Sequence, residues 1–283
     1  MSSTRVTTTV AELREALAAE QSPLVLDVRW SLGDPYGRDH YADAHIPGAV
    51  YVDLDTELAA PPSPDGGRHP LPEIGDLQVA ARSWGLRQGQ PVVVYDDLGN
   101  TAAARAWWLL RYAGVADVTL LDGALGAWRA AELPLESGIP ADPQPGDIVL
   151  RAGGLPLTDT DGAAELAREG LLLDARAGER YRGEVEPVDP RAGHIPGAVS
   201  APTGENLATD GTFLSPELLR ERFEVLGADA TSRIGVYCGS GVTAAHQIAA
   251  LALAGFDATL FAGSWSAWSA DPTRPAATGP EPA

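Results

Sequence analysis

Residues 234–254 read Ile234-Gly-Val-Tyr-Cys-Gly-Ser-Gly-Val-Thr-Ala-Ala-His-Gln-Ile-Ala-Ala-Leu-Ala-Leu-Ala254, and Gly255 follows. The apolar start predicts a buried strand, and the alanine- and leucine-rich part from Thr243 predicts a helix that ends at Gly255. Between them lies a loop of small residues that contains Cys238, the single cysteine of the chain. Strand, short loop and helix in this order are typical of an α/β fold.

The loop at Cys238 is suited to hold an anion. Gly239 and Gly241 allow the backbone to curl so that successive N–H groups point inward, and the start of the next helix adds a positive field. A thiol in such a place is expected to ionise readily, and the thiolate is the nucleophilic form. Cys238 is therefore a candidate reactive cysteine, and the alternative is an inert cysteine in the apolar core.

The chain contains the same pattern twice. Leu24-Val-Leu-Asp-Val-Arg29 matches Leu171-Leu-Leu-Asp-Ala-Arg176. His45-Ile-Pro-Gly-Ala-Val50 recurs without change from His194 to Val199, and both histidines are expected to hold hydrogen-bonded turns. Strands that alternate with helices predict, for each repeat, a mostly parallel sheet flanked by helices. We therefore predict an α/β fold of two tandem domains.

The repeats also give the domain boundaries. We predict a first domain over residues 6–132, a proline-rich linker over 133–156, a second domain over 157–270 and a disordered tail over 271–283. Asp96 stands in the first repeat where Cys238 stands in the second. Because a carboxylate cannot do thiol chemistry, the first domain is predicted to be non-catalytic and the second catalytic.

Composition narrows the partners and the compartment. The net charge of −19 disfavours nucleic acid and anionic membranes as partners. No apolar run approaches the ~20 residues of a membrane span, and the N-terminus has no apolar signal core, so we expect a cytoplasmic protein. A single cysteine excludes an internal disulfide and a multi-cysteine metal site. All 20 basic residues are arginine, which excludes lysine Schiff-base chemistry, and we expect neither a metal nor a cofactor.

Two tandem domains with His-Ile-Pro-Gly-Ala-Val near the front of each, and a cysteine loop only in the second, resemble the two-domain rhodaneses. The resemblance covers about residues 6–275. The loop from Cys238 to Thr243 is similar to that of the 3-mercaptopyruvate sulfurtransferases. The basic residues that usually follow the cysteine in thiosulfate-preferring rhodaneses are absent here. The resemblance thus implies two rhodanese-like domains and a sulfurtransferase.

The resemblance also implies a reaction cycle. Cys238 would take a sulfane sulfur from 3-mercaptopyruvate or thiosulfate as a persulfide and pass it to cyanide or to a thiol, such as that of a thioredoxin-like protein. Inward-facing amides of the loop would stabilise the persulfide anion. The loop residues implied in binding are Gly239, Gly241, Val242 and Thr243.

Further residues gain roles from the resemblance. Ser240, His69 and Asp55 match a serine, a histidine and an aspartate that relay protons in the mercaptopyruvate branch, and an imidazole suits this task because it titrates near neutral pH. The alternatives are a solvated loop residue for His69 and a surface or capping carboxylate for Asp55. Arg180 matches the substrate-binding arginine, whose guanidinium would grip a carboxylate or thiosulfonate by two hydrogen bonds.

The chain departs from the mercaptopyruvate branch at one position. Those enzymes typically carry a second arginine some nine residues after the first, and this sequence has Pro187-Val-Asp189 in that neighbourhood, with Arg191 just beyond. The donor therefore stays open between 3-mercaptopyruvate and thiosulfate.

Other uses of the cysteine remain as alternatives. Cysteine-dependent phosphatases and arsenate reductases carry an arginine six residues after the nucleophile, and Ala244 at that position disfavours them. A non-catalytic sulfur-carrier or regulatory module and a redox sensor are the other two alternatives.

Overall fold

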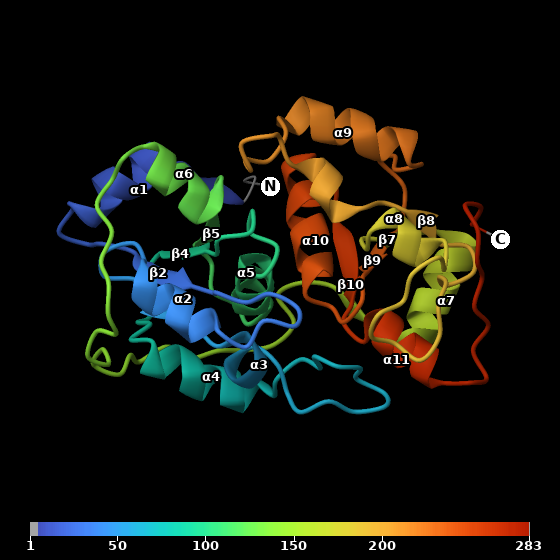
Figure 1. Ribbon diagram of the computed structural model, residues 1–283, viewed down its shortest axis with the longest axis horizontal. Helices are drawn as coiled ribbons and strands as arrows, with labels where there is room; N and C mark the ends of the chain where they lie inside the picture. Colours follow the sequence, from blue (N-terminus) through green and yellow to red (C-terminus); the bar gives the residue numbers. More distant parts are fainter. Residues whose placement is uncertain (1–4, 283) are drawn as a thin grey trace. The chain divides into compact units, whose positions relative to one another are not determined.

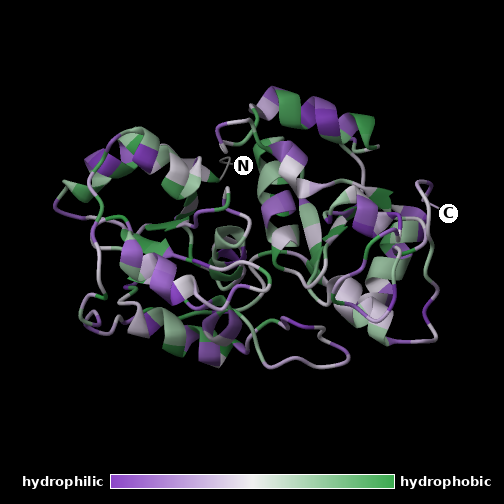
Figure 2. Cartoon of the chain, viewed as in Figure 1, coloured by the Kyte–Doolittle hydropathy of each residue, from purple (hydrophilic) through white to green (hydrophobic). Residues whose placement is uncertain are grey.

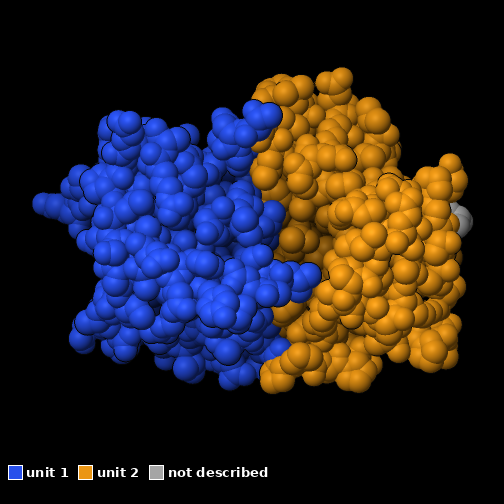
Figure 3. All heavy atoms as spheres, in the orientation of Figure 1, with its two compact units in different colours: residues 1–60, 72–155, 209–213 blue, residues 61–71, 156–208, 214–283 orange. Residues whose placement is uncertain are grey.

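Two five-stranded parallel sheets organise the chain, in a computed structural model that describes residues 5–282. Figure 3 shows the two units built around them. The first unit comprises the chain up to Ala60 with residues 72–155 and 209–213, and the second comprises residues 61–71, 156–208 and 214 onward. This division differs from the predicted boundaries, because residues 61–71 of the first repeat belong to the second unit.

The first unit has the sheet order β1-β5-β4-β2-β3, and all neighbours are parallel. Figure 1 labels the three inner strands β5, β4 and β2. Its strands are β1 (Thr7–Thr8), β2 (Leu24–Asp27), β3 (Val50–Tyr51), β4 (Val92–Tyr95) and β5 (Val118–Leu121). Its helices are α1 (Val10–Leu17), α2 (Gly37–Asp43), α3 (Leu54–Glu57), α4 (Ile74–Ser83), α5 (Ala103–Tyr112) and α6 (Ala124–Ala130).

The second unit repeats this order as β6-β10-β9-β7-β8, again parallel throughout. Its strands are β6 (Leu157–Thr158), β7 (Leu171–Asp174), β8 (Val199–Ser200), β9 (Ile234–Tyr237) and β10 (Ala258–Phe261). Its helices are α7 (Thr160–Glu169), α8 (Gly178–Tyr181), the 3-10 turn η1 (Thr203–Asn206), α9 (Pro216–Val225), α10 (Thr243–Leu253) and α11 (Ser264–Ala270). The predicted tandem α/β fold is confirmed.

The inner strands are apolar because helices cover both faces of each sheet. All four residues of β2, β4, β7 and β9 are buried. Most residues of these strands are Leu, Val or Ile, to which Figure 2 gives the green of the hydrophobic end of its scale. Helix α10 is also buried from Ala244 to Leu251, although His246 and Gln247 within it are polar. A helix that is buried on nearly all sides is stable only in the interior, so its first turn is fixed at the end of β9.

The repeated histidines are structural, as expected. His45 Nδ1 lies 2.9 Å from the carbonyl oxygen of Tyr41, and the two rings stack with centroids 4.0 Å apart. His194 does the same with Tyr181, at 2.8 Å and 3.8 Å. Each pair secures the turn that leads into the short edge strand of its sheet.

The C-terminal tail pairs with this turn in the second unit. His194 and Ala277 exchange backbone hydrogen bonds of 2.9 Å and 3.0 Å, and the Gly279 amide donates to the carbonyl of Arg182. The prediction of a disordered tail is therefore wrong for residues 271–282, because the backbone of this segment finds partners along the unit. Among residues 5–282, no helix combines the length and the apolar character needed to span a membrane.

A buried ion pair closes the carboxyl end of an inner strand in each unit. Arg176 Nη2 donates to Asp174 at 2.6 Å, and Arg29 Nη2 donates to Asp27 at 2.7 Å. The four side chains are at most 3% exposed. Removing one partner of such a pair leaves the other charge buried without compensation.

Replacing Arg176 with methionine should therefore destabilise the second unit. We expect the free energy of unfolding, measured by denaturant titration, to fall by about 3–5 kcal/mol. The matched control is Arg233→Met, whose pair with Glu165 is exposed and should contribute at most about 1 kcal/mol. Equal losses in the two variants would contradict a stabilising role of the buried pair.

Candidate active site

The sulfur of Cys238 is held by the loop between β9 and α10. Cys238 directly follows β9 and is 1% exposed. Its Sγ accepts a hydrogen bond from the amide of Gly241 at 3.2 Å, so the backbone turns back onto the sulfur within three residues. Val242 is buried behind this turn, and Thr243 begins α10. The sulfur thus faces a backbone donor and not only apolar side chains.

Gly241 is required for this turn. It adopts a φ of +78°, in the left-handed region that side chains disfavour. A Cβ atom at this position would also lie 2.3 Å from the carbonyl oxygen of Ala262. Glycine is the residue that meets both conditions.

The start of α11 supports the loop from the other side. The amides of Trp265 and Ser266 donate to the carbonyl oxygens of Cys238 and Gly239, at 3.0 Å and 2.9 Å. The hydroxyl of Ser264 accepts the Cys238 amide at 3.1 Å and lies 4.0 Å from Sγ. Ser264 was not predicted from the sequence.

A comparison of the two repeats could have identified Ser264. Ser264 has a φ of +52°, and Ala124 adopts +54° at the equivalent place in the first unit. The amide of Leu125 donates to the Asp96 carbonyl at 2.9 Å, as that of Trp265 does to Cys238. A hydroxyl is therefore present at this strained position only in the repeat that has the thiol.

His69 and Ser240 meet in the second unit. His69 Nδ1 lies 2.7 Å from the hydroxyl oxygen of Ser240, two residues after the cysteine. The segment 61–71 that carries His69 lies against α11, where the Arg68 amide donates to Ser266 Oγ at 3.1 Å. A Cβ on Gly67 would lie 2.3 Å from the same oxygen, so this close approach depends on glycine.

Asp55 lies in the other unit, on α3. Its exposed carboxylate accepts a hydrogen bond from Trp30 Nε1 at 3.0 Å. Its part in a proton relay stays a prediction.

Arg180 projects from α8 toward the cysteine loop. A Cβ placed on Gly239 would lie 3.3 Å from Arg180 Nη1. The same guanidinium donates to Glu186 at 2.7 Å and to Asp189 at 3.3 Å. Its predicted role in binding the donor is compatible with this position and stays a prediction.

Two buried carboxylates shape the charge around Arg180. Asp189 forms a second ion pair with Arg68, which was not predicted as a site residue. Burial raises the pKa of Asp189, and the charges of Arg68 and Arg180 oppose that rise. Burial acts in the same direction on Glu186, but hydrogen bonds from the Asp189 amide and from Arg180 bring the pKa of Glu186 below its usual value.

Arg191 takes no part in this cluster. Its guanidinium donates to four backbone carbonyl oxygens around the end of α11, those of Trp268, Ser269, Asp271 and Arg274. Arg191 thus binds carbonyl oxygens at the C-terminal end of α11. It therefore does not take the place of the second arginine of the mercaptopyruvate branch.

A family model of the rhodanese-like domain matches residues 9–131 and again residues 159–271. The chain belongs to the rhodanese family. Full-length rhodanese relatives include a protein of Mycobacterium tuberculosis named as a thiosulfate sulfurtransferase, 49% identical over 97% of this chain and 98% of its own. A protein of Pseudomonas aeruginosa named as a 3-mercaptopyruvate sulfurtransferase is also 49% identical, over 99% of this chain and 100% of its own.

Solved rhodanese structures agree with this assignment. The 3-mercaptopyruvate sulfurtransferase SseA of Escherichia coli has a TM-score of 0.81 and 31% identity, and the match covers 93% of this chain and all of that one. The enzyme of Leishmania major gives the same TM-score and identity over 93% of this chain and 73% of its own. The predicted family, fold and sulfurtransferase class are confirmed by these comparisons.

The first rhodanese domain fills the equivalent loop with a side chain of its own. The carboxylate of Asp96 is fully buried and accepts four backbone amides at 2.7–3.0 Å. These amides belong to Leu98, Asn100, Ala102 and Ala103. Burial raises the pKa of Asp96, and the four N–H groups oppose that rise. The loop of this repeat therefore closes on a carboxyl group of the chain itself, where the second repeat has a thiol.

Substituting Gly241 by alanine should disrupt the sulfur cradle. We expect the free energy of unfolding to fall by about 1–3 kcal/mol, because the new Cβ is strained and approaches Ala262. The matched control is Gly126→Ala in α6, where a Cβ meets open space and should stabilise the helix by up to about 1 kcal/mol. Denaturant titration of both variants measures this, and shifts of the same sign would argue against the proposed constraint.

Proposed function

We propose that this rhodanese transfers sulfane sulfur from 3-mercaptopyruvate or thiosulfate to cyanide or a thiol through a persulfide on Cys238. The observation that carries the proposal is the contact between the Gly241 amide and Cys238 Sγ. A backbone donor aimed at Sγ stabilises negative charge on that atom, both in the attacking thiolate and when Sγ leaves again as a thiolate in the acceptor step. The names of the full-length relatives support the two donors.

The donor step transfers one sulfur atom. The Cys238 thiolate attacks the sulfur of 3-mercaptopyruvate, a new S–S bond forms, and the electrons of the broken C–S bond go to carbon as the enolate of pyruvate. With thiosulfate, the S–S bond of the donor breaks and sulfite leaves with its electrons. Only the first donor produces a carbanion equivalent that must be protonated.

The acceptor step regenerates the thiolate. Cyanide attacks the outer sulfur, and thiocyanate leaves while Cys238 keeps the electrons of the cleaved S–S bond. A thiol does the same and becomes a persulfide. Because the chain has no second cysteine, the acceptor must come from another molecule, for which a thioredoxin-like protein is our candidate. We also propose that the protein works in the cytoplasm and that neither nucleic acid nor a membrane takes part in the cycle.

The contact between His69 and Ser240 supports a role of this pair in moving a proton. Their 2.7 Å contact joins an imidazole to a hydroxyl two residues from the nucleophile. This pair can take the proton of the donor thiol and deliver it to the enolate carbon. Asp55 would assist His69 in this proposal.

Replacing Cys238 with serine should abolish turnover with both donors. Thiocyanate formed from cyanide measures the activity, and mass spectrometry after donor treatment should show one added sulfur on the native protein and none on the variant. Substantial thiocyanate formation by the variant would refute the assignment of the nucleophile.

Replacing His69 with glutamine should separate the two donors. We expect kcat with 3-mercaptopyruvate to fall by about 10²–10⁴-fold, because the enolate loses its proton source. Thiosulfate should lose much less, since sulfite needs no proton on leaving. The control is His40→Gln, a half-exposed histidine of the first unit that pairs with Asp34. An equal loss with both donors would point to a structural role of His69.

A further inference from the structure

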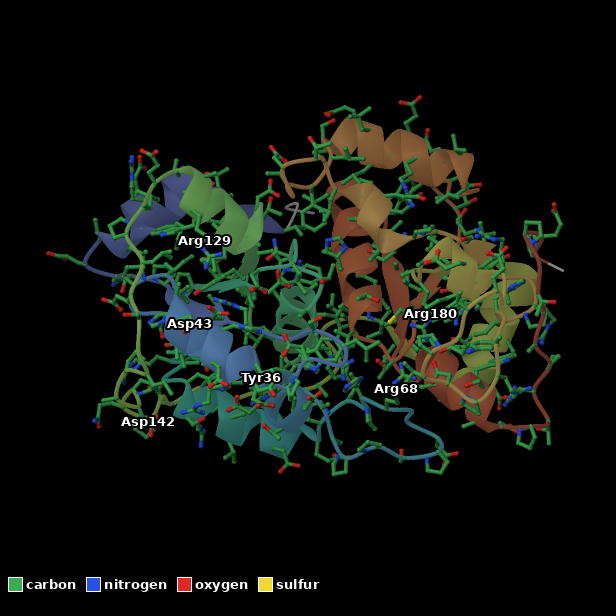
Figure 4. All side chains as sticks on the ribbon, viewed as in Figure 1. Tyr36, Asp43, Arg68, Arg129, Asp142 and Arg180 are labelled. Atoms are coloured by element: carbon green, nitrogen blue, oxygen red, sulfur yellow. The ribbon has the colours of Figure 1, made fainter. Side chains whose placement is uncertain are left out.

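Two guanidinium groups stand beside the residue that follows the nucleophile. A Cβ on Gly239 would lie 3.1 Å from Nη2 of Arg68 and 3.3 Å from Nη1 of Arg180. Its three nearest neighbours would all be guanidinium nitrogens of these two arginines. Figure 4 labels both side chains, which come from the segment 61–71 and from α8 of the second unit. Gly239 leaves this space free.

Both arginines keep a donor that the described residues do not use. The Nε atoms of Arg68 and Arg180 are buried and have no hydrogen-bond partner within residues 5–282. Buried donors in proteins almost always have an acceptor. Arginine presents its donors in a fixed planar fork that fits carboxylate and other oxyanions. The two groups are therefore suited to an external anion next to Cys238.

A carboxylate of the chain holds the two arginines together. Asp189 is 3% exposed, and its two oxygens accept from Arg68 Nη1 and Arg180 Nη2. Without such a bridge, two guanidiniums at one place would repel each other. Glu186 also pairs with Arg180, so the four side chains have no net charge. Directed N–H groups, and not a net positive charge, must therefore stabilise a bound anion. Asp189 repels that anion, and the repulsion is stronger for a dianion than for a monoanion.

We propose that Arg68 binds the sulfur donor together with Arg180, and that Asp189 sets the preference for a singly charged donor group. The inference rests on the proposed function, since it assigns the carboxylate of 3-mercaptopyruvate, or the sulfonate end of thiosulfate, to this pair. Arg68 is then a binding residue supplied by the segment 61–71. The carboxylate monoanion is favoured over the thiosulfate dianion.

The competing explanation is a structural clasp. In that case the Arg68–Asp189 pair only fastens the segment 61–71, and its loss would misplace His69. If the pair is only structural, its loss should lower kcat to a similar extent for donors of different charge. A binding role changes the affinity of the donor itself.

Calorimetric titration of the Cys238→Ser protein measures that affinity without turnover. Adding Arg68→Gln should weaken the Kd for 3-mercaptopyruvate and for thiosulfate by about tenfold to hundredfold, as expected for a lost charge-assisted hydrogen bond. Arg68→Lys keeps the charge and should recover part of the loss. The matched control is Arg182→Gln, which removes an exposed ion pair with Glu184 next to α8 and should change Kd by less than about twofold.

The Asp189→Asn variant tests the charge preference in the same background. It should tighten thiosulfate binding more than 3-mercaptopyruvate binding, because the dianion gains most from removing a negative neighbour. Equal Kd values for Arg68→Gln and Arg182→Gln would overturn the binding role of Arg68. Equal changes for both donors in Asp189→Asn would overturn the preference.

The proposed function fails by a different result. If both donors bind to the Cys238→Ser protein in an Arg68-dependent way, yet the native protein forms no persulfide, the anion site stands and the sulfur transfer does not. If the native protein turns over normally and Arg68→Gln binds both donors with unchanged Kd, the sulfur transfer stands and the binding role of Arg68 does not.

Discussion

The sulfur of Cys238 can lie at the end of a buried strand because the backbone reverses within three residues to present an amide to it. That reversal needs the positive φ of Gly241, which packs too closely on Ala262 for any side chain. The helix that follows is buried from Ala244 to Leu251, so burial fixes its first turn. The remaining parts of the site are arranged around this one bend.

An acidic chain must attract an anion locally. With a net charge of −19, long-range electrostatics repel 3-mercaptopyruvate and thiosulfate, which are both anions. Around the loop the charges alternate from Arg68 through Asp189, Arg180, Glu186 and Arg176 to Asp174. Each guanidinium is held by a carboxylate, so its donors are fixed in direction before a ligand arrives. Such preorganisation lowers the cost of ordering side chains on binding.

The two repeats use the same loop in different ways. In the first, four amides close on the side chain of Asp96. In the second, one amide closes on a thiol, and Ser264 adds a hydroxyl where the first repeat has Ala124. One backbone geometry therefore accommodates either the carboxyl group of Asp96 or the thiol of Cys238. The side chain at the end of the strand decides which of the two it holds.

The sequence by itself determined the fold and the candidate nucleophile. The repeated Leu-x-Leu-Asp-x-Arg and His-Ile-Pro-Gly-Ala-Val segments predict two parallel sheets, because local periodicity and turn chemistry carry this information. Asp96 and Cys238 follow equivalent strands, so the alignment of the two repeats alone shows that a carboxyl group replaces the thiol in the first. The pairing of His69 with Ser240 came from the family resemblance, and the 2.7 Å contact brings the two residues together.

Only the tertiary structure decided how the site is completed. The segment 61–71 lies far from Cys238 in sequence, and no local pattern shows that it belongs to the second unit. Arg68, Asp189 and Ser264 reach the loop through contacts between residues far apart along the chain. The ordered tail escaped prediction for the same reason, because its proline-rich composition suggests disorder while its hydrogen-bond partners lie some 80 residues earlier. Periodicity reports which face of an element is buried, but long-range packing selects the neighbour.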